Sequence, residues 1–191
     1  MKPMTHRRCP WAGPEPVYID YHDKEWGRPL HDDRQLFELL VLEGMQAGLS
    51  WVTVLKKRPA FRAAFDGFDP EKVARYDEEK VQSLLKDTGI IRHRGKIRAA
   101  IGNAKAFLEI QRQYGSFDAF IWAYVDNRPI VNRPLSMEDV PASTPLSRRI
   151  SGDLKKRGFR FVGPTIVYSF MQSAGLVNDH MAWCRCAPPS P

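Results

Sequence analysis

Residues 144–175 read TPLSRRISGDLKKRGFRFVGPTIVYSFMQSAG, which is the pattern of a helix, a tight glycine-bearing turn and a second helix. Thr144 with Pro145 can begin the first helix, and Gly158 can end it. Pro164 starts the second helix, and Gly175 closes it. The free N–H groups of the second helix would face the turn and favour phosphate there. Many such hairpins are purely structural, but basic side chains flank this one, at Lys155, Lys156, Arg157 and Arg160.

The rest of the chain repeats helical periodicity and capping residues, whereas alternating strand patterns are scarce. Helices are predicted at about 33–47, 51–57, 78–86, 95–113 and 117–125, with an irregular connection at 126–145. Pro59 and Pro70 are expected in the first turns of helices, where proline is tolerated. We therefore predict an all-α protein, with one unit over residues 1–186, a hairpin motif at about 148–174 and a flexible tail at 187–191.

The composition favours a globular protein with an acidic partner. The chain has 191 residues, of which 43% are hydrophobic and 27% charged, and its net charge is +7. Nucleic acid is the commonest partner of a basic protein, although a merely basic soluble protein fits as well. The sequence shows neither a signal-peptide pattern at its start nor a run of 18 apolar residues, so no membrane association is expected. Three cysteines cannot all pair, which favours a reducing, cytoplasmic compartment.

The two ends of the chain each carry a cysteine and a histidine. Cys9 and His22 lie near the N-terminus, and His180 and Cys184 lie near the C-terminus. Two thiolates and two imidazoles are a complete tetrahedral set for zinc. The spacing of His180 and Cys184 would place both on one face of a helix. Residue types alone leave a second interpretation open, in which two thiols are buried and both histidines are ordinary.

Glu43 interrupts the apolar face of a predicted helix. Leu36, Leu39, Leu40 and Ala47 are seven, four, three and four residues from it, so it shares their face, whereas Glu38 lies off this stripe. A carboxylate facing a core is costly unless it is paired or lines a cavity. Either this end of the helix turns to solvent or Glu43 belongs to a functional site, and the glycines that follow it favour the second interpretation.

Aromatic residues gather in the same part of the sequence. Each suits a core on its own, but together they suit a pocket for a flat ring, with Glu43 accepting hydrogen bonds from the ring edge. These residues are Trp11, Tyr18, Tyr21, Trp26 and Trp51. Leu49, between two predicted helices, is either a core residue or an exposed apolar wedge.

Five motifs occur in the order known from one family. They are YHDKEWG at 21–27, LEGMQAGLSW at 42–51, GIIRHRGKI at 89–97, FVGPT at 161–165 and LVNDH at 176–180. From about residue 8 to residue 186, the chain resembles the DNA-3-methyladenine glycosylase I family. The resemblance implies an almost entirely α-helical fold of the helix-hairpin-helix glycosylase superfamily. It also implies one structural zinc ion that joins the termini.

The resemblance assigns roles to individual residues. It implies that zinc is bound by Cys9, His22, His180 and Cys184. It implies that Glu43 recognises methylated adenine between Tyr21 and Trp51, with Trp11 and Tyr18 nearby. It implies that the space left by an extruded base is entered by Gly48 and Leu49. It likens residues 158–165, with Phe161, Gly163 and Thr165, to a hairpin that grips phosphate.

One position departs from the superfamily pattern. Other members carry Val-Asp-x-His after the hairpin, and that aspartate is catalytic, whereas this chain has Asn178 there, followed by Asp179. We expect Asn178 to help place the sugar or water and Asp179 to make hydrogen bonds beside a zinc ligand. The lesion base is already a cation, so it leaves with less assistance than an unmodified purine, and the expected enzyme is monofunctional.

The expected substrate is damaged double-stranded DNA, and the expected product is free 3-methyladenine. Phosphate contacts are expected from basic residues that include Arg92, Arg94, Lys96, Lys155, Lys156 and Arg160. A monomer fits an enzyme that wraps one bent duplex. The main alternative is a zinc-stapled DNA-binding protein without activity. A zinc hydrolase is disfavoured because four protein ligands leave no open position, and a zinc deaminase because its H-x-E and P-C-x-x-C motifs are absent from the sequence.

Overall fold

The computed structural model describes residues 7–189 and is mostly helical. Its α-helices are α1 (Pro16–Lys24), α2 (Asp33–Gln46), α3 (Trp51–Ala64), α4 (Pro70–Val73), α5 (Glu78–Lys86), α6 (Arg94–Tyr114), α7 (Phe117–Trp122), α8 (Pro145–Lys156) and α9 (Pro164–Ser173). Short 3₁₀ turns occur at Pro10–Ala12, Asp66–Phe68, Ala123–Val125 and Met137–Asp139. Two strands, β1 (Ile130–Val131) and β2 (Val177–Asn178), complete the described fold.

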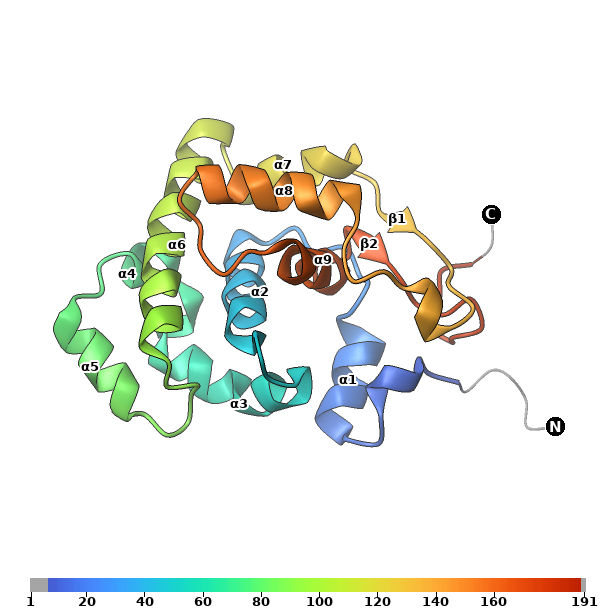
Figure 1. Ribbon diagram of the computed structural model, residues 1–191, viewed down its shortest axis with the longest axis horizontal. Helices are drawn as coiled ribbons and strands as arrows, with labels where there is room; N and C mark the ends of the chain where they lie inside the picture. The colour runs from blue at the N-terminus through green and yellow to red at the C-terminus, as the bar shows by residue number, and fades with distance from the viewer. Residues whose placement is uncertain (1–6, 190–191) are drawn as a thin grey trace.

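Helix α2 is the central element of the core. All ten residues from 36 to 45 are buried, so this helix is covered on every side. It packs against α9, α6, α3 and α7, and α8 crosses over α9 (Figure 1). A residue on α2 therefore reaches solvent only where its neighbours leave a cavity.

The helix, turn and helix predicted for residues 144–175 are confirmed. The side chain of Thr144 accepts a hydrogen bond from the N–H of Ser147, and Pro145 occupies the first turn of α8. Gly158 has a φ of +95°, which glycine tolerates best, and it ends that helix. The hydroxyl of Ser151 donates to the carbonyl of Val162 and so fixes the turn against α8.

The prediction for Pro59 was wrong. Helix α3 runs to Ala64 instead of ending near residue 57, and Pro59 lies in its interior. Proline removes one helical hydrogen bond and typically costs ~3 kcal/mol there. Beyond it, Phe61 and Phe65 are fully buried in the core. Burial of two aromatic side chains outweighs that cost. Pro70 does begin α4, as predicted, with Asp69 as its N-cap.

The predicted helix containing His180 and Cys184 was also wrong. Residues 126–145, predicted to be irregular, contribute β1, which pairs in parallel with β2 through Ile130 and Val177. Because of this pairing, the chain just before His180 is extended, and residues 181–187 form turns instead of a helix. The two side chains nevertheless converge, as described below.

Glu38 on α2 is buried as well, although the sequence pattern placed it off the apolar stripe. Its carboxylate pairs with Arg58 and Arg62 of α3, and Arg58 also reaches Glu25 just after α1. Only 4% of Glu38 is exposed. Buried charges are tolerated when they are paired in this way, so the network links α1, α2 and α3.

Within residues 7–189, no helix is long and apolar enough to cross a membrane. The two ends of this part of the chain meet, since the N–H of Arg185 donates to the carbonyl of Arg7. Of the predicted flexible tail, residues 190 and 191 lie outside the described residues, and its flexibility stays a prediction. Ala187 donates to the carbonyl of Cys184.

Gly175 allows the N-terminal segment to lie against α9. The N–H of Gly27 donates to the carbonyl of Gln172, and that of Leu30 donates to Ala174. A Cβ atom on Gly175 would lie 2.2 Å from the carbonyl carbon and oxygen of Arg28, and its φ is +75°. Both the close approach and the backbone conformation require glycine at this position.

We predict that Gly175→Ala lowers the free energy of unfolding by roughly 3 kcal/mol, because the methyl group meets backbone atoms and the φ is unfavourable. Denaturant unfolding measures the change. Gly152→Ala in α8 is the matched control, since a Cβ there meets no described atom within 4 Å. It should leave stability unchanged or raise it by up to about 1 kcal/mol. Equal effects of the two substitutions would contradict the close approach.

Candidate functional site

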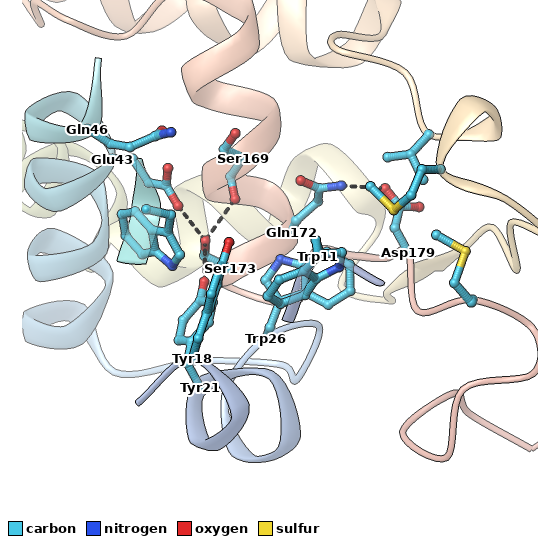
Figure 2. A pocket seen from close by; sticks show the side chains of 14 residues that line it. Trp11, Tyr18, Tyr21, Trp26, Glu43, Gln46, Ser169, Gln172, Ser173 and Asp179 are labelled. Atoms are coloured by element: carbon cyan, nitrogen blue, oxygen red, sulfur yellow. Dashed lines mark hydrogen bonds between the residues drawn. The ribbon is translucent and has the colours of Figure 1, made fainter. Parts of the chain in front are cut away.

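A pocket opens between α2, α9 and the segment that contains α1 (Figure 2). Its volume is about 230 Å³. It is lined by Trp11, Tyr18, Tyr21, Trp26, Glu43, Gln46, Trp51, Met137, Val140, Ser169, Gln172, Ser173, Asp179 and Met181. All five aromatic residues predicted to form a pocket are among them. The pocket therefore combines aromatic faces with two buried acidic side chains, Glu43 and Asp179.

Glu43 ends a chain of hydrogen bonds in this pocket. The hydroxyl of Tyr21 donates to Ser173 Oγ over 2.8 Å, and Ser173 Oγ donates to Glu43 Oε1 over 2.5 Å. Only 2% of Glu43 is exposed. Loss of solvation raises the pKa of this carboxyl group to about 8, although the hydrogen bond from Ser173 opposes the rise. Glu43 is thus the perturbed acid that the interrupted apolar face predicted.

The aromatic side chains form the walls around Glu43. Trp11 contacts Tyr18 and Trp26, with ring centroids 5.1 and 4.7 Å apart, and the rings of Tyr21 and Trp51 are 5.6 Å apart. The indole N–H of Trp51 is buried and has no hydrogen-bond partner among residues 7–189. Buried donors are normally satisfied, so this N–H is available to a ligand.

The sequence interpretation missed the wall that α9 contributes. Ser169, Gln172 and Ser173 project from one face of α9 into the pocket, where Ser173 bonds to Glu43 and Gln172 to Asp179 (Figure 2). Their spacing of three and four residues on an otherwise apolar helix was the available signal. Polar groups at those positions complete the pocket because α9 packs directly against α2.

Asn178 and Asp179 have different surroundings. Asn178 is not among the described residues that line the pocket; its side chain donates to the carbonyl of Gly27 and accepts from the N–H of His180. Asp179 does line the pocket, and its carboxylate accepts three hydrogen bonds. The donors are Asn132, Tyr168 and Gln172. This agrees with the hydrogen-bonding role expected for Asp179.

Two exposed apolar side chains project from neighbouring loops. Leu49 is 42% exposed and follows Gly48, whose φ is +80°. Phe161, in the turn between α8 and α9, is 39% exposed and has a φ of +55°. A Cβ on Gly44 would lie 3.3 Å from the Cβ of Phe161, so the end of α2 approaches that turn closely.

The turn between α8 and α9 ends at Gly163, which is the N-cap of α9. Thr165 follows in the first turn of α9, where it is exposed. Lys96, expected among the phosphate contacts, is instead buried. Its ammonium group donates to the carbonyls of Met45 and Ala47.

Cys9, His22, His180 and Cys184 come together as a buried cluster. Their donor atoms all lie within 4.8 Å of one another, so the four side chains can hold a metal ion. Cys184 Sγ lies 3.5 Å from His22 Nε2 and 3.6 Å from His180 Nδ1, and Cys9 Sγ lies 3.6 Å from His180 Nδ1. The cluster joins the two ends of the chain, as predicted.

Neighbouring groups orient the four side chains. Asp23 bonds to Nδ1 of His22 over 2.8 Å, and the carbonyl of Trp26 bonds to Nε2 of His180 over 3.0 Å. These contacts direct the other ring nitrogens into the cluster. Backbone N–H groups of Met181 and Cys186 donate to the two sulfur atoms. Such donors favour thiolates, which are the form that binds metals.

Known proteins resemble this chain over almost its whole length. DNA-3-methyladenine glycosylase 1 of Escherichia coli K12 is 54% identical over 181 residues, which cover 95% of this chain and 97% of that protein. A crystal structure of 3-methyladenine DNA glycosylase I superimposes with a TM-score of 0.93 at 54% identity, over 95% of this chain and all of that one. The enzyme from Staphylococcus aureus, solved to explain its recognition of 3-methyladenine, is 40% identical, with a TM-score of 0.93 over 96% of this chain and 98% of that one.

Residues 11–187 match the sequence pattern of the methyladenine glycosylases. The matched region contains the pocket, the turn between α8 and α9, and three members of the cysteine–histidine cluster. The match to this pattern and the 54% identity to the Escherichia coli enzyme over 95% of the chain show that the chain belongs to the methyladenine glycosylase family.

Proposed function

We propose that this protein is a base-excision repair glycosylase that hydrolyses the N-glycosidic bond of 3-methyladenine in alkylated DNA. The observation that carries the proposal is the buried carboxylate of Glu43 in an aromatic pocket. Relatives that share this fold over almost the whole chain are named for the same reaction. Fold alone would not assign an activity, but here the pocket supplies the chemistry that the reaction needs.

Glu43 and the aromatic rings would select the lesion. Methylation at N3 makes the nucleotide base a cation, which gains from stacking on Tyr21 and Trp51. The carboxylate of Glu43 accepts hydrogen bonds from the edge of the base, and Trp51 Nε1 has a free N–H to donate. Excision breaks the bond between the sugar and the base, and the bonding electrons leave with the cationic base, which becomes neutral. Water supplies the hydroxyl group to the sugar and releases one proton to solvent. These side chains hold the base while the bond breaks.

Asn178 would support the reaction from behind the pocket, and Asp179 from the pocket wall. Two hydrogen bonds hold Asn178 to Gly27 and His180, which favours a positioning role over direct contact with the sugar. We propose that Asn178 helps to place the sugar or water indirectly, and that its effect is smaller than that of a residue in direct contact. A base that is already cationic leaves with little assistance, so a catalytic aspartate is dispensable at this position.

Loops at one end of the fold would bind damaged double-stranded DNA. Leu49 and Gly48 would enter the space left by the extruded base, at an unstacking cost of a few kcal/mol. Phe161, Gly163 and Thr165 would place the turn before α9 against phosphate, where its free N–H groups face the ligand. We further propose a monomer that releases the free base and leaves the strand uncut.

Zinc is the metal that the cysteine–histidine cluster fits. Zn–S bonds of about 2.3 Å and Zn–N bonds of about 2.0 Å place tetrahedral sulfur and nitrogen ligands roughly 3.5 Å apart. The observed separations of 3.5–3.6 Å agree with this value. Four protein ligands fill the coordination shell, so a structural role for zinc is favoured over a catalytic role in hydrolysis. The pocket likewise favours an enzyme over a DNA-binding protein without activity.

We predict that Glu43→Gln lowers the single-turnover rate of 3-methyladenine release by roughly 100-fold, because the amide cannot provide the acceptor pair and negative charge of the carboxylate. The measurement is the amount of free base released from methylated duplex DNA. Glu109→Gln, at a half-exposed carboxylate on α6, is the control and should keep the parental rate. Release by Glu43→Gln at the parental rate would refute the recognition role.

We predict that kcat/KM rises as pH increases toward 8. With a pKa of about 8, most Glu43 is protonated at pH 7 in the free protein, and recognition uses the carboxylate form. Ser173→Ala removes a hydrogen bond that lowers this pKa and should move the rise to higher pH. In Glu43→Gln the rise should vanish. A profile that stays flat between pH 6 and pH 9 in the parental protein would contradict the assignment.

We predict about one equivalent of zinc per chain and a lower melting temperature after chelation, since the ion joins both ends of the chain. Metal analysis and thermal unfolding provide the measurements. Cys184→Ser should lose the metal, whereas Cys186→Ser, whose thiol lies outside the four ligands, should retain it. Less than half an equivalent, or an unaltered melting curve after chelation, would exclude a zinc staple.

A further inference from the structure

Lys96 of α6 is a buried charge that the proposed mechanism leaves unused. Only 8% of the residue is exposed. Its Nζ donates to the carbonyl of Met45 over 2.9 Å and to that of Ala47 over 2.6 Å. Both acceptors lie at the C-terminal end of α2, immediately before Gly48 and Leu49. The ammonium group therefore contacts protein backbone beside the loop that is proposed to enter DNA.

The end of α2 needs such a donor. The last carbonyls of a helix have no partner within the helix, and the negative end of its dipole favours a cation. Leu49, four residues after Met45, donates its N–H to the carbonyl of Gln46 instead. The Met45 carbonyl is thereby left to Lys96 among the described residues. Lys96 thus permits the sharp turn that exposes Leu49.

The same face of α6 holds the second DNA-facing loop. Asn103 lies seven residues, or about two helical turns, after Lys96. Its side-chain amide donates to the carbonyl of Arg160 and accepts from the N–H of Arg160, over 3.0 and 2.8 Å. Gly44 and Phe161 close the small gap between these two contacts. One face of α6 therefore contacts both loops proposed to bind DNA.

We propose that Lys96 is a positioning residue for base extrusion, which holds the 47–50 loop so that Leu49 enters the duplex, and that it makes no phosphate contact. This inference rests on the proposed function. It extends that function by assigning the conformation of the wedge to a side chain that touches neither DNA nor base. A phosphate-binding lysine and a loop-holding lysine lead to different measurements.

The test compares Lys96→Met, which keeps the length and removes the donors, with Arg98→Met, an exposed position on the same helix that pairs with Glu78. The first measurement is single-turnover release of 3-methyladenine from duplex and single-stranded DNA of one sequence. K96M should lose roughly 10- to 100-fold on duplex, as expected for a displaced wedge, and less than about threefold on single strands. Equal losses on both substrates would overturn the proposal.

The second measurement is the salt dependence of binding to duplex DNA. Removing a phosphate contact lowers the slope of log affinity against log salt by about one, whereas removing a loop contact leaves it unchanged. We expect an unchanged slope for K96M. A slope smaller by about one would show that Lys96 binds phosphate and would overturn the assignment.

The third measurement does not depend on catalysis. Amide hydrogen exchange in residues 44–51 should be faster by about tenfold or more in K96M and unchanged in Arg98→Met. Unchanged exchange in K96M would overturn the inference, even if excision proved absent in the parental protein. That absence would by itself refute only the proposed function. Lys96→Gln, which keeps one N–H donor group, replaces K96M if that variant fails to fold.

A double-mutant cycle completes the test. If Lys96 acts through Leu49, K96M should lower the single-turnover rate on duplex DNA by less than about threefold in a Leu49→Ala background. The reason is that Leu49→Ala has already removed the side chain that Lys96 would position. Full additivity of the two losses on duplex DNA would mean that Lys96 acts elsewhere.

Discussion

The burial of α2 is the constraint on which the rest of the structure depends. Helix α2 is covered on every side by α9, α6, α3 and α7, so a carboxylate in its buried stretch must be satisfied inside the protein. Glu38 is satisfied by arginines from α3. Glu43 has one hydroxyl partner and an open pocket instead. The same packing that stabilises the fold therefore raises the pKa of Glu43, a carboxyl group that lines the pocket.

The cysteine–histidine cluster acts at a distance from this acid. It joins the first turn of the described chain to the segment that follows β2, and Trp11, two residues after Cys9, lies at 5.1 Å from the ring of His22. The aromatic wall of the pocket belongs to the segment that the cluster holds. Gly175 brings that segment against α9 from the other side. The pocket is thus assembled from elements far apart in the sequence.

Much of this arrangement could be predicted from sequence because it depends on local patterns. Periodicity and caps located α2, α5, α8 and α9, and one acid on an apolar face located the pocket. The errors concern places where tertiary contacts override local preference. Pro59 stays inside α3 because buried aromatics follow it, and His180 lies in extended chain because β1 pairs before it. Lys96 looked like a phosphate contact because sequence gives the charge of a side chain but not its partner.

The Ser173 hydroxyl has a single hydrogen and lies between two acceptors, Glu43 and the carbonyl of Ser169 (Figure 2). It also accepts the hydrogen of Tyr21. When Glu43 loses its proton to solvent, the Ser173 hydroxyl can therefore turn its hydrogen toward the new carboxylate without the movement of a heavy atom. With a pKa of about 8, ionisation at pH 7 costs on the order of 1.4 kcal/mol. Under the proposed function, attraction to a cationic base offsets that cost, whereas a neutral adenine offsets little of it. The ionisation of Glu43 would thus set an energetic threshold by which the pocket discriminates charge before any bond breaks.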